Sequence, residues 1–144
     1  MVQFQRLSFA IVLGGVLIAG GACRSSPAAP DDPSLSGTYA THVTLVQDGC
    51  GGTRVQDNST LVTHNVETSA ITLQHGGQAY FGTVKSDKTF TTAPGTVDVG
   101  DGFIYVITLA GQFGTGTFTA DVTVDRSANG VTCRYLVHWV GTRV

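Results

Sequence analysis

Three cysteines and four histidines are, besides the carboxylates, the residues of this 144-residue chain best suited to bind a metal, and the cysteines could also act as nucleophiles. The histidines are His42, His64, His75 and His138. They form neither a His-x-His nor a His-Glu-x-x-His spacing, the patterns that place zinc ligands on one element. No Gly-x-Ser-x-Gly turn is present to expose a serine nucleophile. The sequence therefore predicts no enzyme, no catalytic residue, no metal ligand and no cofactor.

His42 and His138 are the one histidine pair that the strand pattern described below could bring together. Both fall on the polar face of strands that a closed barrel would make neighbours, so with a third ligand they could hold a metal. We favour two solvated histidines, because the sequence indicates no third ligand. His64 and His75 are expected at ordinary strand and turn positions.

The aspartates stand mostly at turns, as Asp48-Gly49 and Asp101-Gly102 illustrate, where the carboxylate serves the bend of the backbone. Asp98 and Asp101 are close in sequence, but turn chemistry explains them better than a catalytic pair does. Arg54 lies in a long polar loop, residues 51–58. Binding residues concentrate on loops held by a rigid scaffold, so this loop is a candidate for binding, the alternative being a tolerated insertion.

Cys23 ends the run Leu17-Ile-Ala-Gly-Gly-Ala-Cys23, which follows a positive segment at Arg6 and an apolar stretch over residues 7–18. This stretch has the length of a signal-peptide core and is too short to span a bilayer. The run resembles the lipobox of bacterial lipoproteins, although Gly20 replaces the leucine usual in that family. The resemblance implies a signal peptide at residues 1–22 and a lipidated Cys23 that anchors the protein to a membrane.

Lipidation of Cys23 would resolve the odd number of cysteines, because Cys50 and Cys133 would remain as a pair in an oxidising compartment. Residues 24–36 contain three of the four prolines and show no apolar periodicity. With Cys23 they predict a lipidated, flexible Pro/Ala/Ser tether over residues 23–36. At roughly 3.1 Å per residue this tether would reach about 40 Å. One β domain is expected over residues 37–144.

The composition restricts the classes of partner. Hydrophobic residues make up 42% and charged residues only 12% of the chain, which is typical of a globular rather than a disordered protein. The formal net charge is −2, and the basic residues are scattered. Nucleic acid is therefore not an expected partner, since its recognition needs a basic stripe.

Alternating apolar residues and glycine turns predict about eight short strands and no helix after residue 37. The expected strands cover residues 39–45, 61–66, 71–73, 78–86, 89–92, 103–109, 118–124 and 131–139. The last strand is opened by Asn129-Gly130, a strong hairpin signal. The side chains expected to face inward are Tyr39, Leu45, Leu73, Phe90, Tyr105, Ile107, Phe118, Tyr135 and Trp139.

The placement of the cysteines favours an antiparallel up-and-down barrel over a two-sheet sandwich. Cys50 follows the first strand and Cys133 begins the last, and these two points meet at one rim of an even-stranded barrel. An immunoglobulin-type sandwich would instead join two mid-strand cysteines with a tryptophan between them, whereas Trp139 follows Cys133. The segments Ser36-Gly-Thr-Tyr39 and Gly116-Thr-Phe-Thr-Ala120 resemble the lipocalin-like and avidin-like barrels of some bacterial lipoproteins.

These observations predict an exported protein of the bacterial cell envelope, lipid-anchored at Cys23 and expected at the outer membrane. The predicted function is non-catalytic binding of a small apolar ligand or an envelope protein through the barrel mouth or its rim loops. The large inward-facing aromatics favour the rim over an interior pocket. The alternative, which rests on fold analogy alone, is a protease-inhibitor-like or structural envelope protein.

Overall fold

The computed structural model describes residues 34–144, which form nine β-strands and no helix. The strands are β1 (Gly37–Asp48), β2 (Asn58–Asn65), β3 (Ala70–His75), β4 (Gln78–Val84), β5 (Thr89–Thr92), β6 (Gly95–Asp98), β7 (Ile104–Phe113), β8 (Thr117–Ala128) and β9 (Val131–Arg143). All pairings between neighbouring strands are antiparallel, as the alternating pattern and the glycine turns predict.

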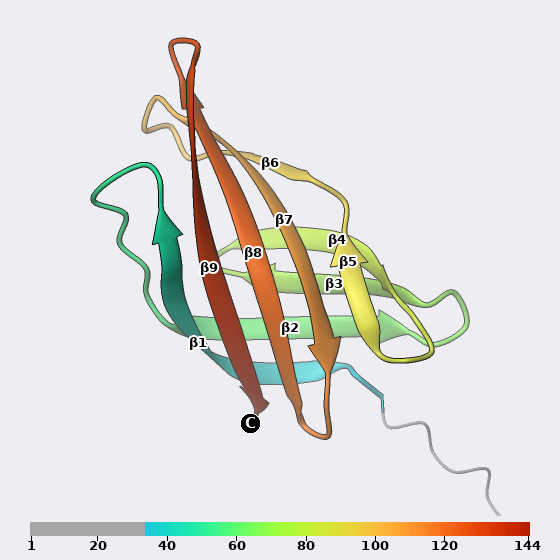
Figure 1. Ribbon diagram of the computed structural model, residues 1–144. Coiled ribbons are helices and arrows are strands. Elements are labelled where there is room, and N and C mark those ends of the chain that lie inside the picture. Colours follow the sequence, from blue (N-terminus) through green and yellow to red (C-terminus); the bar gives the residue numbers. More distant parts are fainter. Residues whose placement is uncertain (1–33) are drawn as a thin grey trace, which may run out of the picture. The chain divides into compact units, whose positions relative to one another are not determined.

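Eight of these strands close into the predicted up-and-down barrel. The first and last strands pair, with Val43 opposite Trp139, and β5 pairs with β7 to complete the ring. In Figure 1, β7, β8 and β9 run steeply across one side, while β2, β3 and β4 cross behind them. Closure leaves no open edge within the ring, which is how small barrels avoid unwanted strand pairing.

The ninth strand, β6, lies outside the ring and was not among the predicted strands. It pairs with the first half of β7, and β5 pairs with the second half. Pro94 separates β5 from β6, and a proline cannot donate a ladder hydrogen bond. At this break the Leu109 backbone N–H donates to the Thr92 hydroxyl over 2.9 Å instead. A buried side chain thus replaces a missing strand partner.

The core confirms the predicted inward face. Of the nine residues expected to face inward, five are buried: Tyr39, Leu73, Phe90, Phe118 and Trp139. The other four, Leu45, Tyr105, Ile107 and Tyr135, are partly buried and pack against them. The hairpin at Asn129-Gly130 also forms, with positive φ at both residues as a type I′ turn requires.

The predicted signal peptide, Cys23 and most of the predicted tether lie outside the described residues. Leu35, at the end of the predicted tether, is buried in the barrel core. The part of the chain described by the structure, residues 34–144, contains no helix of the length and hydropathy needed to cross a membrane.

Candidate functional site

The two ends of the barrel are built differently. One end carries the loop after β1, which we call the rim loop (residues 49–57), together with the β3–β4 and β8–β9 turns. We call this end the mouth. The other end, the closed end, receives the chain at residues 34–36 and carries the β7–β8 turn.

Aromatic side chains fill the closed end. The Phe118 ring lies 5.3 Å from the Tyr39 ring and 5.8 Å from the Phe113 ring, measured between centroids. Gly141 lies opposite Phe118 on β9, and a Cβ there would overlap the Phe118 ring. The glycine therefore provides the space in which the aromatic ring lies against the sheet.

The segment that enters the barrel covers this aromatic cluster. Leu35 is buried, and its carbonyl oxygen accepts a hydrogen bond of 2.9 Å from the Tyr39 hydroxyl. The Arg143 guanidinium lies over the Tyr39 ring and donates to the Ser34 carbonyl oxygen. The described chain thus closes this end from residue 34 onward.

The mouth, by contrast, retains a cavity of about 170 Å³. Its apolar wall comes from β1, β7, β8 and β9 and consists of Val43, Ile107, Val122, Val124, Val137 and Trp139. His75, Tyr80 and Tyr135 add polar groups, and Arg54, Val55 and Gln56 of the rim loop complete the lining. An apolar wall with a few polar groups is the usual composition of a small-molecule site.

A chain of hydrogen-bonded side chains leads from the buried core to His75 in the cavity wall. The hydroxyls of Thr41 and Thr60 lie 2.7 Å apart, and the Thr60 hydroxyl lies 2.8 Å from Nδ1 of His75. The His75 ring also stacks on Trp139, with 4.1 Å between ring centroids. Burial lowers the pKa of His75 below its usual 6.5 and raises the pKa of Tyr80. Both side chains are therefore neutral near pH 7.

Two aspartates fix the ends of the rim loop. The Asp48 carboxylate accepts hydrogen bonds from the backbone N–H groups of Cys50, Gly51 and Thr53, at 2.9 to 3.0 Å. At the other end, the Asp57 carboxylate accepts from the Val43 backbone N–H over 2.8 Å. The bonds from the rim loop lower the pKa of Asp48, and the hydrogen bond with the His42 ring, together with that from Val43, lowers the pKa of Asp57. The loop over the cavity is thus held at both ends.

The predicted disulfide joins Cys50 to Cys133, with 5.1 Å between their Cα atoms. It ties the start of the rim loop to β9 next to the mouth. Gly49 reinforces this connection, because its backbone N–H donates to the Arg134 carbonyl oxygen over 2.9 Å. The two cysteines thus meet at one rim of the barrel, as its predicted closure requires.

Arg126 lies beyond the cavity on the inner face of β8, two residues after Val124. Its guanidinium carbon is 4.7 Å from the centroid of the Phe103 ring. Its Nε is buried and has no hydrogen-bond partner among the described residues. Nearby, the Tyr105 hydroxyl donates to the Asp101 carboxylate over 2.6 Å, which lowers the pKa of Asp101 and raises that of Tyr105.

The structure places His42 and His138 on the outer face, as predicted, but pairs each with an aspartate. The Nδ1 of His42 lies 2.9 Å from the Asp57 carboxylate, and that of His138 lies 2.7 Å from the Asp121 carboxylate. Among residues 34–144, no group of three or more histidine, cysteine or acidic side chains is arranged to hold a metal ion.

Arg54 lies at the cavity, in the loop that its sequence context singled out. Sequence reasoning missed His75 and Arg126. The signal was present, because His75 continues the inward face of Ile71 and Leu73, and Arg126 continues that of Val122 and Val124. The expected inward face was limited to apolar and aromatic residues, so these two polar residues were not assigned to it.

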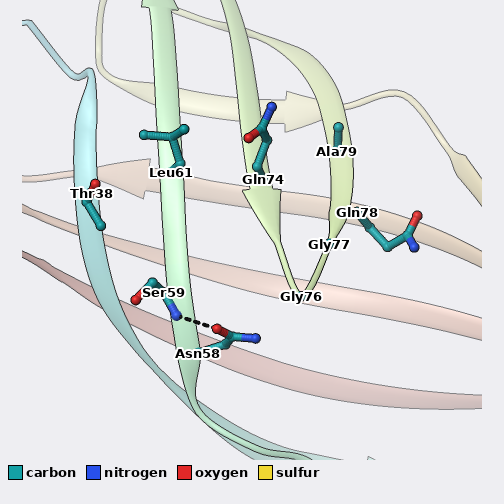
Figure 2. Close-up of a pocket in the computed structure, with 9 residues that line it drawn as sticks. All are labelled: Thr38, Asn58, Ser59, Leu61, Gln74, Gly76, Gly77, Gln78 and Ala79. Atoms are coloured by element: carbon teal, nitrogen blue, oxygen red, sulfur yellow. Dashed lines mark hydrogen bonds between the residues drawn. The ribbon is translucent and has the colours of Figure 1, made fainter.

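A larger hollow of about 440 Å³ lies on the outer surface near the β3–β4 turn (Figure 2). It is lined by Thr38, Asn58, Ser59, Leu61, Gln74, Gly76, Gly77, Gln78 and Ala79. None of these side chains titrates, and most are exposed to solvent. The mouth cavity therefore has the more distinctive chemistry of the two.

Comparisons with models of known protein families, with curated proteins and with solved structures find no match to this chain.

Proposed function

We propose that this protein is a non-catalytic binding module of the bacterial cell envelope that takes a small apolar ligand at the barrel mouth. The observation that carries the proposal is the cavity of about 170 Å³ beneath the rim loop. An apolar cavity of roughly 150 Å³ accommodates a molecule of the size of benzene. The mouth is thus suited to an aromatic ring or a short aliphatic chain.

The way in which the rim loop is held supports a cavity that binds a ligand. The disulfide and the carboxylates of Asp48 and Asp57 hold the rim loop over the cavity. A site whose loop is already ordered loses less conformational entropy when a ligand binds. The neutral His75 and Tyr80 provide polar groups without placing a charge in the apolar wall.

Lipid anchoring through Cys23 is the second part of the proposal, and the lipobox-like run supports it. The described domain begins at its closed end, so a tether joined there leaves the mouth accessible. Expression in bacteria with labelled palmitate tests this part. We expect label in the wild-type chain and none in Cys23→Ser. An unlabelled wild-type chain would remove the anchor from the proposal.

The binding part is tested with toluene as a neutral apolar probe. Trp139 is the single tryptophan of the chain and lines the cavity, so its fluorescence reports occupancy. We expect a saturable change for the wild-type protein and for Val140→Phe, which enlarges an exposed residue on β9. Val137→Phe, which adds volume to the cavity wall on the same strand, should abolish the response. No response in the wild-type protein would refute an apolar cavity ligand.

A further inference from the structure

Arg126 differs from the other arginines whose contacts are defined in this domain. Arg134 forms a two-point ion pair with Asp125, with distances of 2.7 and 2.9 Å. Arg143 donates to the Ser34 carbonyl oxygen and to the Tyr39 hydroxyl. None of the ion pairs found in residues 34–144 includes Arg126.

This setting leaves part of the Arg126 guanidinium without its usual partner. Its Nε is buried and makes no hydrogen bond with a described residue, while the Phe103 ring covers the guanidinium at 4.7 Å. A buried donor without an acceptor destabilises a fold, and charged groups suffer most. The terminal nitrogens of the guanidinium are not enclosed and also lack a hydrogen-bond partner among the described residues, so they remain available to an acceptor from outside the chain.

Arg126 lies next to the residues that line the cavity, on the same face of β8. Val124 and Tyr135 lie opposite each other on β8 and β9, and both line the cavity. Arg126 is the next inward position on β8 after Val124. Two residues of a strand span roughly 7 Å, so a molecule seated in the cavity can reach Arg126 with a short polar extension.

The charges around the mouth favour a singly charged anion over a doubly charged one. Arg126 and Arg54 contribute two positive charges, whereas Asp48, Asp57 and Asp101 contribute three negative charges that are already engaged in hydrogen bonds. A carboxylate suits a planar guanidinium, whose two terminal nitrogens can donate to its oxygens. A phosphate dianion would instead add repulsion from the Asp101 and Asp48 carboxylates.

We propose that the mouth binds small amphipathic monocarboxylates, with an aromatic ring or short aliphatic chain in the cavity and the carboxylate on Arg126. This inference rests on the proposed function and adds the chemical class of the ligand. It assigns Arg126 as the residue that selects acids over neutral molecules of the same shape.

The test compares three probes of equal size: 3-phenylpropionate, its neutral amide, and the cation 3-phenylpropylammonium. Dissociation constants are measured with full-length protein through Trp139 fluorescence. Charge-assisted hydrogen bonds predict that the propionate binds on the order of tenfold more tightly than the amide. The ammonium probe should bind more weakly than the amide. Added salt should weaken only the advantage of the propionate.

Variants assign the effect to one residue. Arg126→Gln should bring the propionate and the amide to equal affinity and leave the amide unchanged. Arg134→Gln, which removes the same charge from the outer face, should keep the wild-type preference. Arg54→Gln removes the other positive charge of the mouth and shows which of the two arginines carries the preference. If Arg126→Gln does not fold, the wild-type preference and its salt dependence still decide between an acid site and a neutral one.

The outcomes separate the two proposals. If no probe changes the Trp139 fluorescence, and toluene does not either, the proposed cavity function fails and this inference fails with it. If the amide binds as tightly as the propionate, the cavity function stands and the acid site is refuted. If Arg54→Gln removes the preference and Arg126→Gln keeps it, the assignment to Arg126 is wrong.

Discussion

The closed end and the mouth use the same barrel strands for opposite purposes. At the closed end, Phe118 packs on Tyr39 and Phe113, and Gly141 has no side chain that would overlap the Phe118 ring. At the mouth, the inward positions of the same strands carry valines, His75 and Arg126, and a cavity remains. Side-chain volume at a few inward positions therefore decides whether each end of a barrel of this size is filled or hollow.

The largest expected effect concerns the bond that holds the mouth together. The double variant Cys50→Ser/Cys133→Ser should lose roughly 4 to 5 kcal/mol of unfolding free energy in the chain-entropy model. The linked residues are 83 positions apart, so the loop released in the unfolded chain is long. Chemical denaturation of this variant, compared with the wild-type protein in its oxidised form, measures the loss.

The same variant distinguishes the two ends. Hydrogen exchange should show faster opening of the rim loop and the start of β9, with the strands around Phe118 still protected. Uniform loss of protection at both ends would contradict the assignment of the disulfide to the mouth. A stability equal to that of the wild type would show that the bond adds little to the fold.

A second prediction addresses the closed end. Phe118→Ala should destabilise the domain by about 3 to 5 kcal/mol, because it empties the centre of the aromatic cluster. Phe103→Ala makes the same change at the mouth, where the ring is only partly buried and covers Arg126. Its cost should be less than half as large. Equal costs in thermal or urea unfolding would remove the distinction between a packed end and an open one.

A third prediction concerns the hydrogen-bonded side chains behind the cavity, which end at His75 in its wall. Thr60→Val keeps the volume but removes the hydroxyl that contacts both Thr41 and His75. We expect a loss of about 1 to 3 kcal/mol, because two buried polar groups lose a partner. Thr119→Val, at an exposed position on β8, should change stability by less than about 0.5 kcal/mol. If the two variants are equal in urea unfolding, these hydrogen bonds contribute nothing to stability.

Much of the fold could be predicted because it depends on local alternation. Glycine turns, Asn129-Gly130 and the alternating faces of 118–124 and 131–139 indicated the barrel, and its closure indicated the Cys50–Cys133 pairing. Strand β6 escaped because its four residues follow Pro94 and show no clear alternation. This strand is defined by its pairing with β7, and a pattern within four residues does not reveal a pairing with another strand.

The site was predictable only in part. The rim loop was recognised by its length, its polarity and its cysteine, which are local features. The cavity depends on how side chains from β1, β7, β8 and β9 meet, and the aromatics of the sequence suggested a filled interior. Tyr39, Phe90 and Phe118 gather at the closed end. Tyr135 and Trp139 line the cavity but do not fill it. Their distribution between the two ends follows from register, which the sequence alone left open.

The last prediction concerns the pH dependence of stability, because His75 is a titratable group in the wall of the mouth cavity. Burial lowers the pKa of His75 in the folded protein below its usual 6.5. As the pH falls through 6.5, the unfolded chain therefore takes up a proton that the folded protein does not. The free energy of unfolding must fall over the window between 6.5 and the lowered pKa. Above this window the contribution of His75 to stability is fully present.

Thermal unfolding at about pH 7.5 and about pH 5.5 measures this contribution, since the surrounding aspartates stay ionised over that range. The wild type should lose more stability on acidification than His75→Gln does. His138→Gln, which alters a histidine on the outer face, should retain the component that depends on His75. An identical pH dependence for wild type and His75→Gln would mean that His75 takes up its proton equally well in the folded protein. The mouth would then be as open to water as the outer surface, and an apolar ligand would have little reason to enter it.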